Sequence, residues 1–208
     1  MLSVFAVVLS GFTLVARTPR ADYYTLDKHL RIDVKTCESF IAKTEKKLGI
    51  VLPHFEYYRV AGPQDIFRLS VDHHYSGGVA NPDPLYVIAM EPCYKHELVH
   101  LMTYRLGRAS LVFEEGIASL LADDYGLEDR LEAKRLGRRL KLRYGTVNRS
   151  FRDYTGSTGD LHVQYLVSEE FVRHLVHERG LERFLADAYT GADFGEQFDE
   201  WLYGRAAP

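Results

Sequence analysis

The chain has 208 residues, of which 46% are hydrophobic and 26% are charged, and its formal net charge is −3. This composition is ordinary for a globular protein, and the length is enough for one domain with a sizeable core. The sequence pI is near 6.3, whereas nucleic-acid-binding domains usually have a basic patch and a pI above about 9, so no nucleic-acid partner is expected.

The first 16 residues contain no charged side chain and are mostly apolar, and Arg17 follows them. This pattern is typical of a signal-peptide h-region cut after Ala16, although a basic n-region is missing and Leu14 is large for the −3 position. The stretch is short for a membrane span, which needs about 20 residues. We therefore expect export to the periplasm or beyond. An N-terminal membrane anchor, a buried strand or helix, and a cytoplasmic location remain as alternatives.

Two cysteines, Cys37 and Cys93, bear on the same question. In an exported protein they can form a disulfide, whereas in a cytosolic protein they are expected to be buried thiols. Neither belongs to a C-x-x-C pair, so a cysteine metal site is not predicted.

Residue patterns predict strands in the first half of the chain and helices in the second. The predicted strands are residues 23–34, 55–60 and 85–90, and residues 75–84, which hold Gly, Asn and Pro, are predicted to be irregular. The predicted helices are residues 35–48, 63–69, 92–106, 111–124, 127–143, 161–178, 181–189 and 194–203. This order indicates an α+β fold.

A basic cluster at residues 134–143 has leucines at helical spacing. It predicts an amphipathic helix with a solvated basic face, and contact with anionic lipid or an acidic partner is the alternative.

The segment His96-Glu97-Leu98-Val99-His100 reads H-E-x-x-H. On a helix, positions i and i+4 lie on one face, one turn apart. Two imidazoles placed in this way can bind one zinc ion, and the Glu between them can act as general base on a zinc-activated water. The alternative is an ordinary solvated helix face.

A catalytic zinc usually has three protein ligands, so a third is expected from a downstream helix. Glu114 and Glu115 lie there, and the 14 residues between His100 and Glu115 allow the first helix to end and a second to pack back. A helix-start acid, favoured by the helix dipole, is the alternative for Glu115.

The pair HELVH and FEEGIASLL resembles the gluzincin zinc metallopeptidases, and most closely their peptidase MA-like domains. The resemblance implies a zincin-like fold over residues 22–208, in which a small N-terminal mixed sheet and an active-site helix precede a helical C-terminal half. The Glu of the family pattern W-L-x-E-G-x-A is the third zinc ligand, which implies Glu115 rather than Glu114. This chain has Val112-Phe113 in place of Trp-Leu.

The resemblance extends to both sides of this pair. Residues 76–80 and 85–90 resemble the family's edge strand, which pairs with an extended substrate, and the strand that leads to the zinc helix. Residues 165–175 resemble Y-x-x-G/S-x-F-x-x-x-L with one extra residue before Phe. In aminopeptidase-like members the Tyr hydrogen-bonds the tetrahedral intermediate, which implies this role for Tyr165. His162, one turn earlier, is the competing donor.

The resemblance therefore implies a hydrolase that cleaves peptide or protein substrates, with one Zn²⁺ per chain bound by His96, His100 and Glu115 and with Glu97 as general base. The alternatives are a non-catalytic zinc-containing module that binds a peptide or a cell-wall component, and a membrane-tethered protein with a structural zinc. The aminopeptidase motif G-x-M-E-N is absent from residues 78–82, which makes an aminopeptidase less favoured. Endo- or exopeptidase specificity, the substrate and the oligomeric state stay open.

Overall fold

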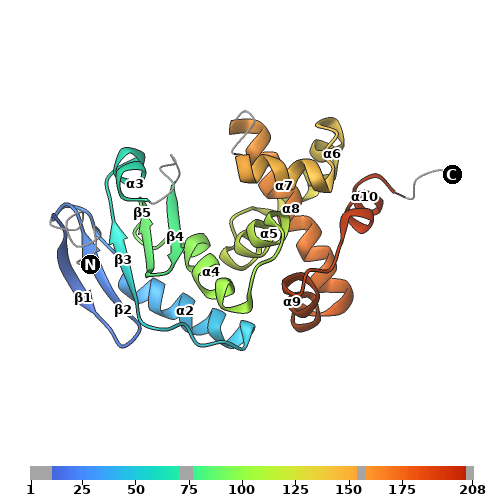
Figure 1. The fold of residues 1–208 in the computed structure, drawn as a ribbon. Coiled ribbons are helices and arrows are strands. Elements are labelled where there is room, and N and C mark those ends of the chain that lie inside the picture. The colour runs from blue at the N-terminus through green and yellow to red at the C-terminus, as the bar shows by residue number, and fades with distance from the viewer. Residues whose placement is uncertain (1–10, 71–76, 154–157, 205–208) are drawn as a thin grey trace. The chain divides into compact units, whose positions relative to one another are not determined.

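The computed structural model describes residues 11–70, 77–153 and 158–204 (Figure 1). The chain divides into two compact units, residues 1–105 and residues 106–208. The described part of the first unit holds a sheet and three helices, and that of the second unit is helical, so the predicted α+β class is confirmed. Among the described residues, no helix is both long and apolar enough to cross a membrane.

The first unit is built on a five-stranded mixed sheet with the strand order β1-β2-β3-β5-β4. The central strands β2, β3 and β5 are parallel, and the edge strands β1 and β4 pair antiparallel with their neighbours. The bounds are β1 Thr13–Arg17, β2 Ala21–Thr25, β3 Phe55–Arg59, β4 Gly78–Pro82 and β5 Leu85–Ala89.

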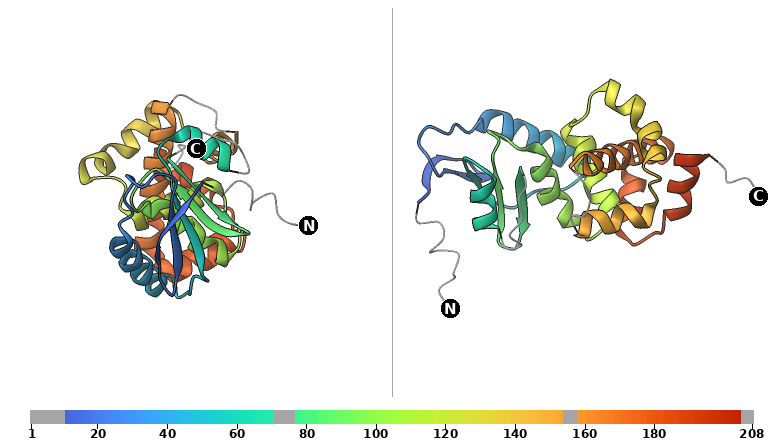
Figure 2. Two further views of the ribbon diagram at one scale, coloured as in Figure 1. Left: turned by 90° about the vertical axis from the view of Figure 1, so that its left-hand side faces the viewer. Right: turned by 90° about the horizontal axis from the view of Figure 1, so that it is seen from above.

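Helices cover both faces of this sheet, because the central strands carry large side chains on both sides. On one face, Tyr58 and Tyr86 pack with Ile66 of α3 (Pro63–Leu69). On the other, the Tyr23 hydroxyl donates a hydrogen bond to Glu38 of α2 (Val34–Leu48). The left view of Figure 2 shows α2 and α3 on opposite sides of the strands.

Local signals explain where the helices of the first unit begin and end. The Asp33 side chain accepts a hydrogen bond from the Thr36 backbone N–H and caps α2, and Gly49 ends the helix in a left-handed conformation with φ 67°. The third helix, α4, spans Lys95–Thr103, and a 3₁₀ turn at Tyr104–Leu106 follows it.

A disulfide joins Cys37 of α2 to Cys93 in the segment that precedes α4. The sequence left this pairing open because it depends on whether the protein is exported to an oxidising compartment.

Two predictions for the first unit are wrong. Residues 26–33 are not a strand, because Asp27 accepts a hydrogen bond from the His29 N–H and starts a turn, and Asp33 caps α2. Residues 78–82 form β4 although they contain Asn and Pro, which an edge strand tolerates.

The predicted signal segment overlaps the first strand. Residues 1–10 lie outside the described part of the chain, and Thr13–Arg17 form β1 with Leu14 and Val15 exposed. Cleavage after Ala16 would therefore remove most of β1, and cleavage itself stays a prediction.

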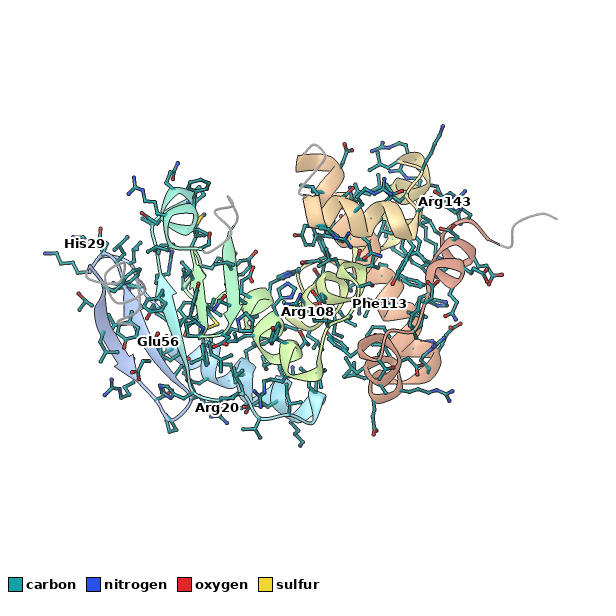
Figure 3. The ribbon with its side chains drawn as sticks, viewed as in Figure 1. Arg20, His29, Glu56, Arg108, Phe113 and Arg143 are labelled. Carbon is teal, nitrogen blue, oxygen red and sulfur yellow. A yellow bond between two sulfur atoms is a disulfide. The ribbon has the colours of Figure 1, made fainter. Side chains whose placement is uncertain are left out.

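The second unit contains six described helices around an aromatic core. They are α5 Leu111–Ala122, α6 Leu127–Arg139, α7 Tyr144–Asp153, α8 Thr158–Arg179, α9 Leu181–Tyr189 and α10 Gly195–Tyr203. The fully buried Phe113 ring lies 4.8 Å from the Phe194 ring and 5.4 Å from the Phe184 ring, and Figure 3 labels it at the centre of this unit. Helices α5 and α8 pack closely, because a Cβ at Gly116 would lie 2.5 Å from the Ser168 carbonyl oxygen.

The largest departures from the prediction in the second unit concern α6 and α7. Helix α6 ends at Arg139 rather than at residue 143, because Lys141 adopts a left-handed conformation with φ 53°. Helix α7 was not predicted, although Tyr144, Val147 and Phe151 have the i, i+3, i+7 spacing of a buried face.

Candidate metal centre

Helix α4 places the two histidines of HELVH on one face. The Nε2 atoms of His96 and His100 lie 3.0 Å apart, and the ring centroids are separated by 4.7 Å. A tetrahedral zinc with Zn–N bonds of 2.0–2.1 Å separates two nitrogens by about 3.3 Å. The observed separation is therefore within a few tenths of an ångström of what a shared zinc ion requires.

Glu115 completes the group. One ligand atom of each of His96, His100 and Glu115 lies within 4.8 Å of the others. Two imidazoles and one carboxylate form a donor set that fits zinc, and three protein ligands are typical of catalytic sites. The neighbouring Glu114 has a different role, because its Oε1 accepts a hydrogen bond from the Ala109 N–H. Metal binding by this group stays a prediction.

The start of α5, the helix that carries Glu115, is held by α7. The Asn148 side-chain oxygen accepts a hydrogen bond from the Val112 N–H at 3.1 Å, and the Tyr144 hydroxyl donates to Ser110 Oγ at 2.7 Å. These contacts satisfy polar groups in the first turn of α5, where backbone N–H groups have no intrahelical acceptor. The sequence did not identify either residue, since α7 itself was missed.

Strand β4 passes directly beside the general-base candidate. A Cβ at Gly78 would lie 2.9 Å from Glu97 Cγ and 2.4 Å from Tyr94 Cδ1. Only glycine fits at this position without moving both side chains. The Gly77-Gly78 pair is the sequence signal for this close approach.

Tyr94 and Tyr57 form a second group of residues that the sequence did not identify. The Tyr94 ring stacks on the His96 ring with centroids 6.0 Å apart and an interplanar angle of 29°. The buried Tyr57 hydroxyl accepts a hydrogen bond from the Tyr94 N–H at 2.9 Å. Burial raises the pKa of Tyr57 well above its ordinary value, so this hydroxyl stays protonated at physiological pH.

The two candidate oxyanion donors both lie on α8. Tyr165 is half-buried, with its ring 4.8 Å from the Phe151 ring, and His162 is exposed, with its ring 5.2 Å from the Tyr125 ring. These packing contacts assign no catalytic role, so the role of Tyr165 and the competing role of His162 stay predictions.

Besides burial, the charge of Glu115 contributes to the raised pKa of Tyr125. Burial raises the pKa of Tyr125, and the negative charges of Asp124, Glu169 and Glu115 raise it further. Glu115 is therefore one of three acidic residues whose negative charge acts on the Tyr125 hydroxyl.

Comparisons of the chain with models of protein families, with curated proteins and with solved structures find no match. A functional assignment must therefore rest on the motif, the donor set and the local geometry described above.

Proposed function

We propose that this protein is a zinc-dependent metallopeptidase with a zincin-like fold, related to the gluzincins and to their peptidase MA-like domains. The proposal depends on one observation: His96 and His100 of the HELVH helix and Glu115 of α5 have ligand atoms close enough to share one metal ion. Two neutral imidazoles and one carboxylate leave a bound zinc ion with a net positive charge. Three protein ligands leave one coordination position for reactants, whereas a structural zinc usually has four protein ligands.

When bound, zinc would acidify water and polarise the scissile carbonyl. Glu97 accepts the proton of the attacking water and delivers it to the leaving amine, as a general base and then a general acid. Its position supports this role, because it neighbours His96 in the sequence and its Cγ packs against Gly78. Tyr165, or His162 in its place, donates a hydrogen bond to the oxyanion.

The proposed substrate is an extended peptide or protein segment. Strand β4 is at the edge of the sheet in the described part of the chain and lies beside Glu97. An edge strand offers backbone N–H and C=O groups to which an extended chain can add as a further strand. We also propose export, which the Cys37–Cys93 disulfide supports because disulfides persist in oxidising compartments.

A non-catalytic zinc module that binds peptides is the second candidate. It would use the same three ligands, and β4 would supply its binding edge. Binding alone needs no general base, so the glutamate between the two histidines favours the enzyme.

The first experiment measures zinc content and hydrolysis of a pool of denatured proteins by the purified chain, with cleavage followed by mass spectrometry. We expect about one zinc per chain, its loss in Glu115→Ala, and its retention in the matched control Glu114→Ala. Glu97→Gln is expected to keep zinc and to lose at least 10²-fold in turnover. Absence of zinc after zinc is added back would overturn the proposal, and turnover that Glu97→Gln leaves intact would remove Glu97 from the mechanism.

A further inference from the structure

The segment that leads into α4 is bridged by one buried hydroxyl. Tyr57 of β3 donates a hydrogen bond to the Glu91 carbonyl oxygen at 2.9 Å and accepts one from the Tyr94 N–H at 2.9 Å. One hydroxyl therefore holds both ends of residues 91–94.

Helix α2 holds the middle of the same segment. The Pro92 carbonyl oxygen accepts a hydrogen bond from the Asp33 N–H at 3.0 Å, at the start of α2. The next residue, Cys93, is bonded through sulfur to Cys37 in the first turns of that helix. A covalent bond therefore fixes the residue two places before α4 to helix α2.

Helix α4 depends on these contacts for its start. It is nine residues long, and its N-cap residue Tyr94 makes no side-chain capping hydrogen bond. Isolated helices shorter than about 12 residues are marginal in water, and an uncapped first turn frays. The first turn of α4 carries His96, whereas His100 lies one turn later. A looser start would therefore displace His96 relative to His100.

We propose that the Cys37–Cys93 disulfide controls the metal centre, so that its reduction lowers the affinity of the His96–His100–Glu115 group for zinc. This inference rests on the proposed metal site and assigns a redox regulation to it. The hydrogen bonds of Tyr57 and Asp33 do not involve sulfur, so they keep the segment close to its place when the disulfide opens. The effect is a loss of affinity in a folded protein.

The reaction requires a dithiol reductant, such as a thioredoxin-type protein. Its thiolate attacks Sγ of Cys93, because Cys93 is half-buried whereas Cys37 is fully buried. The S–S bond breaks, Cys37 leaves as a thiolate and takes up a proton, and a mixed disulfide remains on Cys93. The second thiol of the reductant then displaces Cys93 as a thiol. The protein gains two electrons and two protons, and the reductant becomes a disulfide.

The experiment measures the zinc Kd of the oxidised and the reduced protein by competition with a chromophoric chelator, after the dithiol has been removed under argon. We expect the Kd of the reduced protein to be at least tenfold weaker. The double variant Cys37→Ser/Cys93→Ser should have the same zinc Kd as the reduced protein, and the reductant should not change this Kd. Because serine is not a zinc ligand, this variant also excludes zinc binding by the freed thiolates.

A matched pair of tyrosine variants tests the contacts of the segment. Tyr57→Phe keeps the ring and the disulfide and removes the bridging hydroxyl, and it is expected to weaken zinc binding in the same direction. Tyr58→Phe, at the next position of β3, removes a hydroxyl that donates to Glu56 and lies on the α3 face of the sheet, and it is expected to leave the zinc Kd unchanged.

Thermodynamic linkage supplies a readout that does not depend on activity. If the disulfide strengthens zinc binding tenfold, saturating zinc must stabilise the disulfide by the same factor, which lowers its reduction potential by about 30 mV. A glutathione titration with thiol counting by mass spectrometry measures this shift.

The outcomes separate the two proposals. An oxidised protein that binds no zinc would overturn the metal site and this inference with it. Equal zinc affinities in both redox states, with no shift in potential, would overturn only the inference. Loss of the helical circular dichroism signal on reduction would also overturn it, because the zinc loss would then report unfolding.

Discussion

The two units differ in how they satisfy buried polar groups. In the first unit, the buried hydroxyls of Tyr23, Thr25 and Tyr57 all donate hydrogen bonds to nearby oxygens. In the second unit, several buried polar atoms have no hydrogen-bond partner among the residues that the structure describes. They include Ser119 Oγ on α5, Gln164 Oε1, Ser168 Oγ and Glu169 Oε2 on α8, and Asp199 Oδ1 on α10. The first unit has two such atoms in its described part, Arg59 Nε and Ser70 Oγ.

The difference follows from how the elements pack. In the first unit the acceptors are the Glu38 carboxylate of α2 and the backbone oxygens of Asp27 and Glu91, which lie outside helices and strands. In the second unit α5 and α8 approach closely at Gly116, and side chains in the middle of two long helices meet backbone that is already hydrogen-bonded. A buried polar atom without a partner costs about 1–3 kcal/mol, so stabilising substitutions are expected in the second unit rather than beside the metal helix.

The largest effect is expected at Glu169, a fully buried carboxylate on α8. Burial raises its pKa from 4.5 to about 7, although its ion pair with Arg173 acts in the opposite direction. Below pH 4.5 this group is protonated in both the folded and the unfolded chain. Between pH 4.5 and 7 it ionises only in the unfolded chain, so the free energy of unfolding falls as the pH rises, by up to about 3 kcal/mol. Glu169→Gln should remove this decline and should be more stable than wild type at pH 8.

Urea unfolding followed by tryptophan fluorescence between pH 4 and 8 measures this effect. Trp201 is the only tryptophan of the sequence and packs in the second unit, 5.3 Å from the Phe171 ring, so the signal reports on that unit. Glu170→Gln, which alters the neighbouring half-buried carboxylate, is the matched control and should keep most of the wild-type decline, because burial raises the pKa of Glu169 more than the charge of Glu170 does. A wild-type profile that is flat over this range would show that Glu169 is ionised in the folded state.

The close approach of α5 and α8 predicts the next largest effect. Gly116→Ala places a Cβ 2.5 Å from the Ser168 carbonyl oxygen and 2.6 Å from Val172 Cγ2, so backbone must move. Overpacking of this kind costs about 1–3 kcal/mol of unfolding free energy. Gly145→Ala in α7 is the control, because a Cβ there meets nothing within 4 Å.

The control is expected to change in the opposite direction. Alanine is favoured over glycine inside a helix by up to about 1 kcal/mol, so Gly145→Ala should stabilise the second unit. Urea unfolding monitored at Trp201 measures both variants. Equal stability of Gly116→Ala and wild type would show that the two helices can separate without cost.

Local patterns predicted the part of the candidate site that depends on local geometry. The i, i+4 spacing of His96 and His100 alone determines that they share a helix face, and the short connection to Glu115 makes a second helix nearby the simple expectation. Apolar residues alternate with polar ones at residues 30–34, as in a strand, but side-chain hydrogen bonds of Asp27 and Asp33 favour a turn and a helix cap instead.

The residues that surround the motif could not be predicted in this way. Tyr57 contacts Tyr94 across 37 positions of sequence, and the same sequence pattern is consistent with many such pairings. Gly78 is recognisable as a site of close approach, but nothing in the sequence shows that Glu97 and Tyr94 are the side chains it meets. Both facts depend on the strand order, which places β4 beside β5 at the edge of the sheet.

The smallest effect is expected at the cap of α2 in the first unit. Asp33 Oδ1 accepts a hydrogen bond from the Thr36 N–H at 3.0 Å, and Oδ2 accepts one from the Thr36 hydroxyl at 2.7 Å. Asp33→Ala removes the cap and should cost about 1 kcal/mol, whereas Asp33→Asn keeps an acceptor and should cost much less. Hydrogen exchange of the α2 amides measures the loss in the first unit, while Trp201 fluorescence should report an unchanged second unit. An equal loss in both signals would show that the two units unfold together. The difference in how they satisfy buried polar groups would then not make one unit less stable than the other.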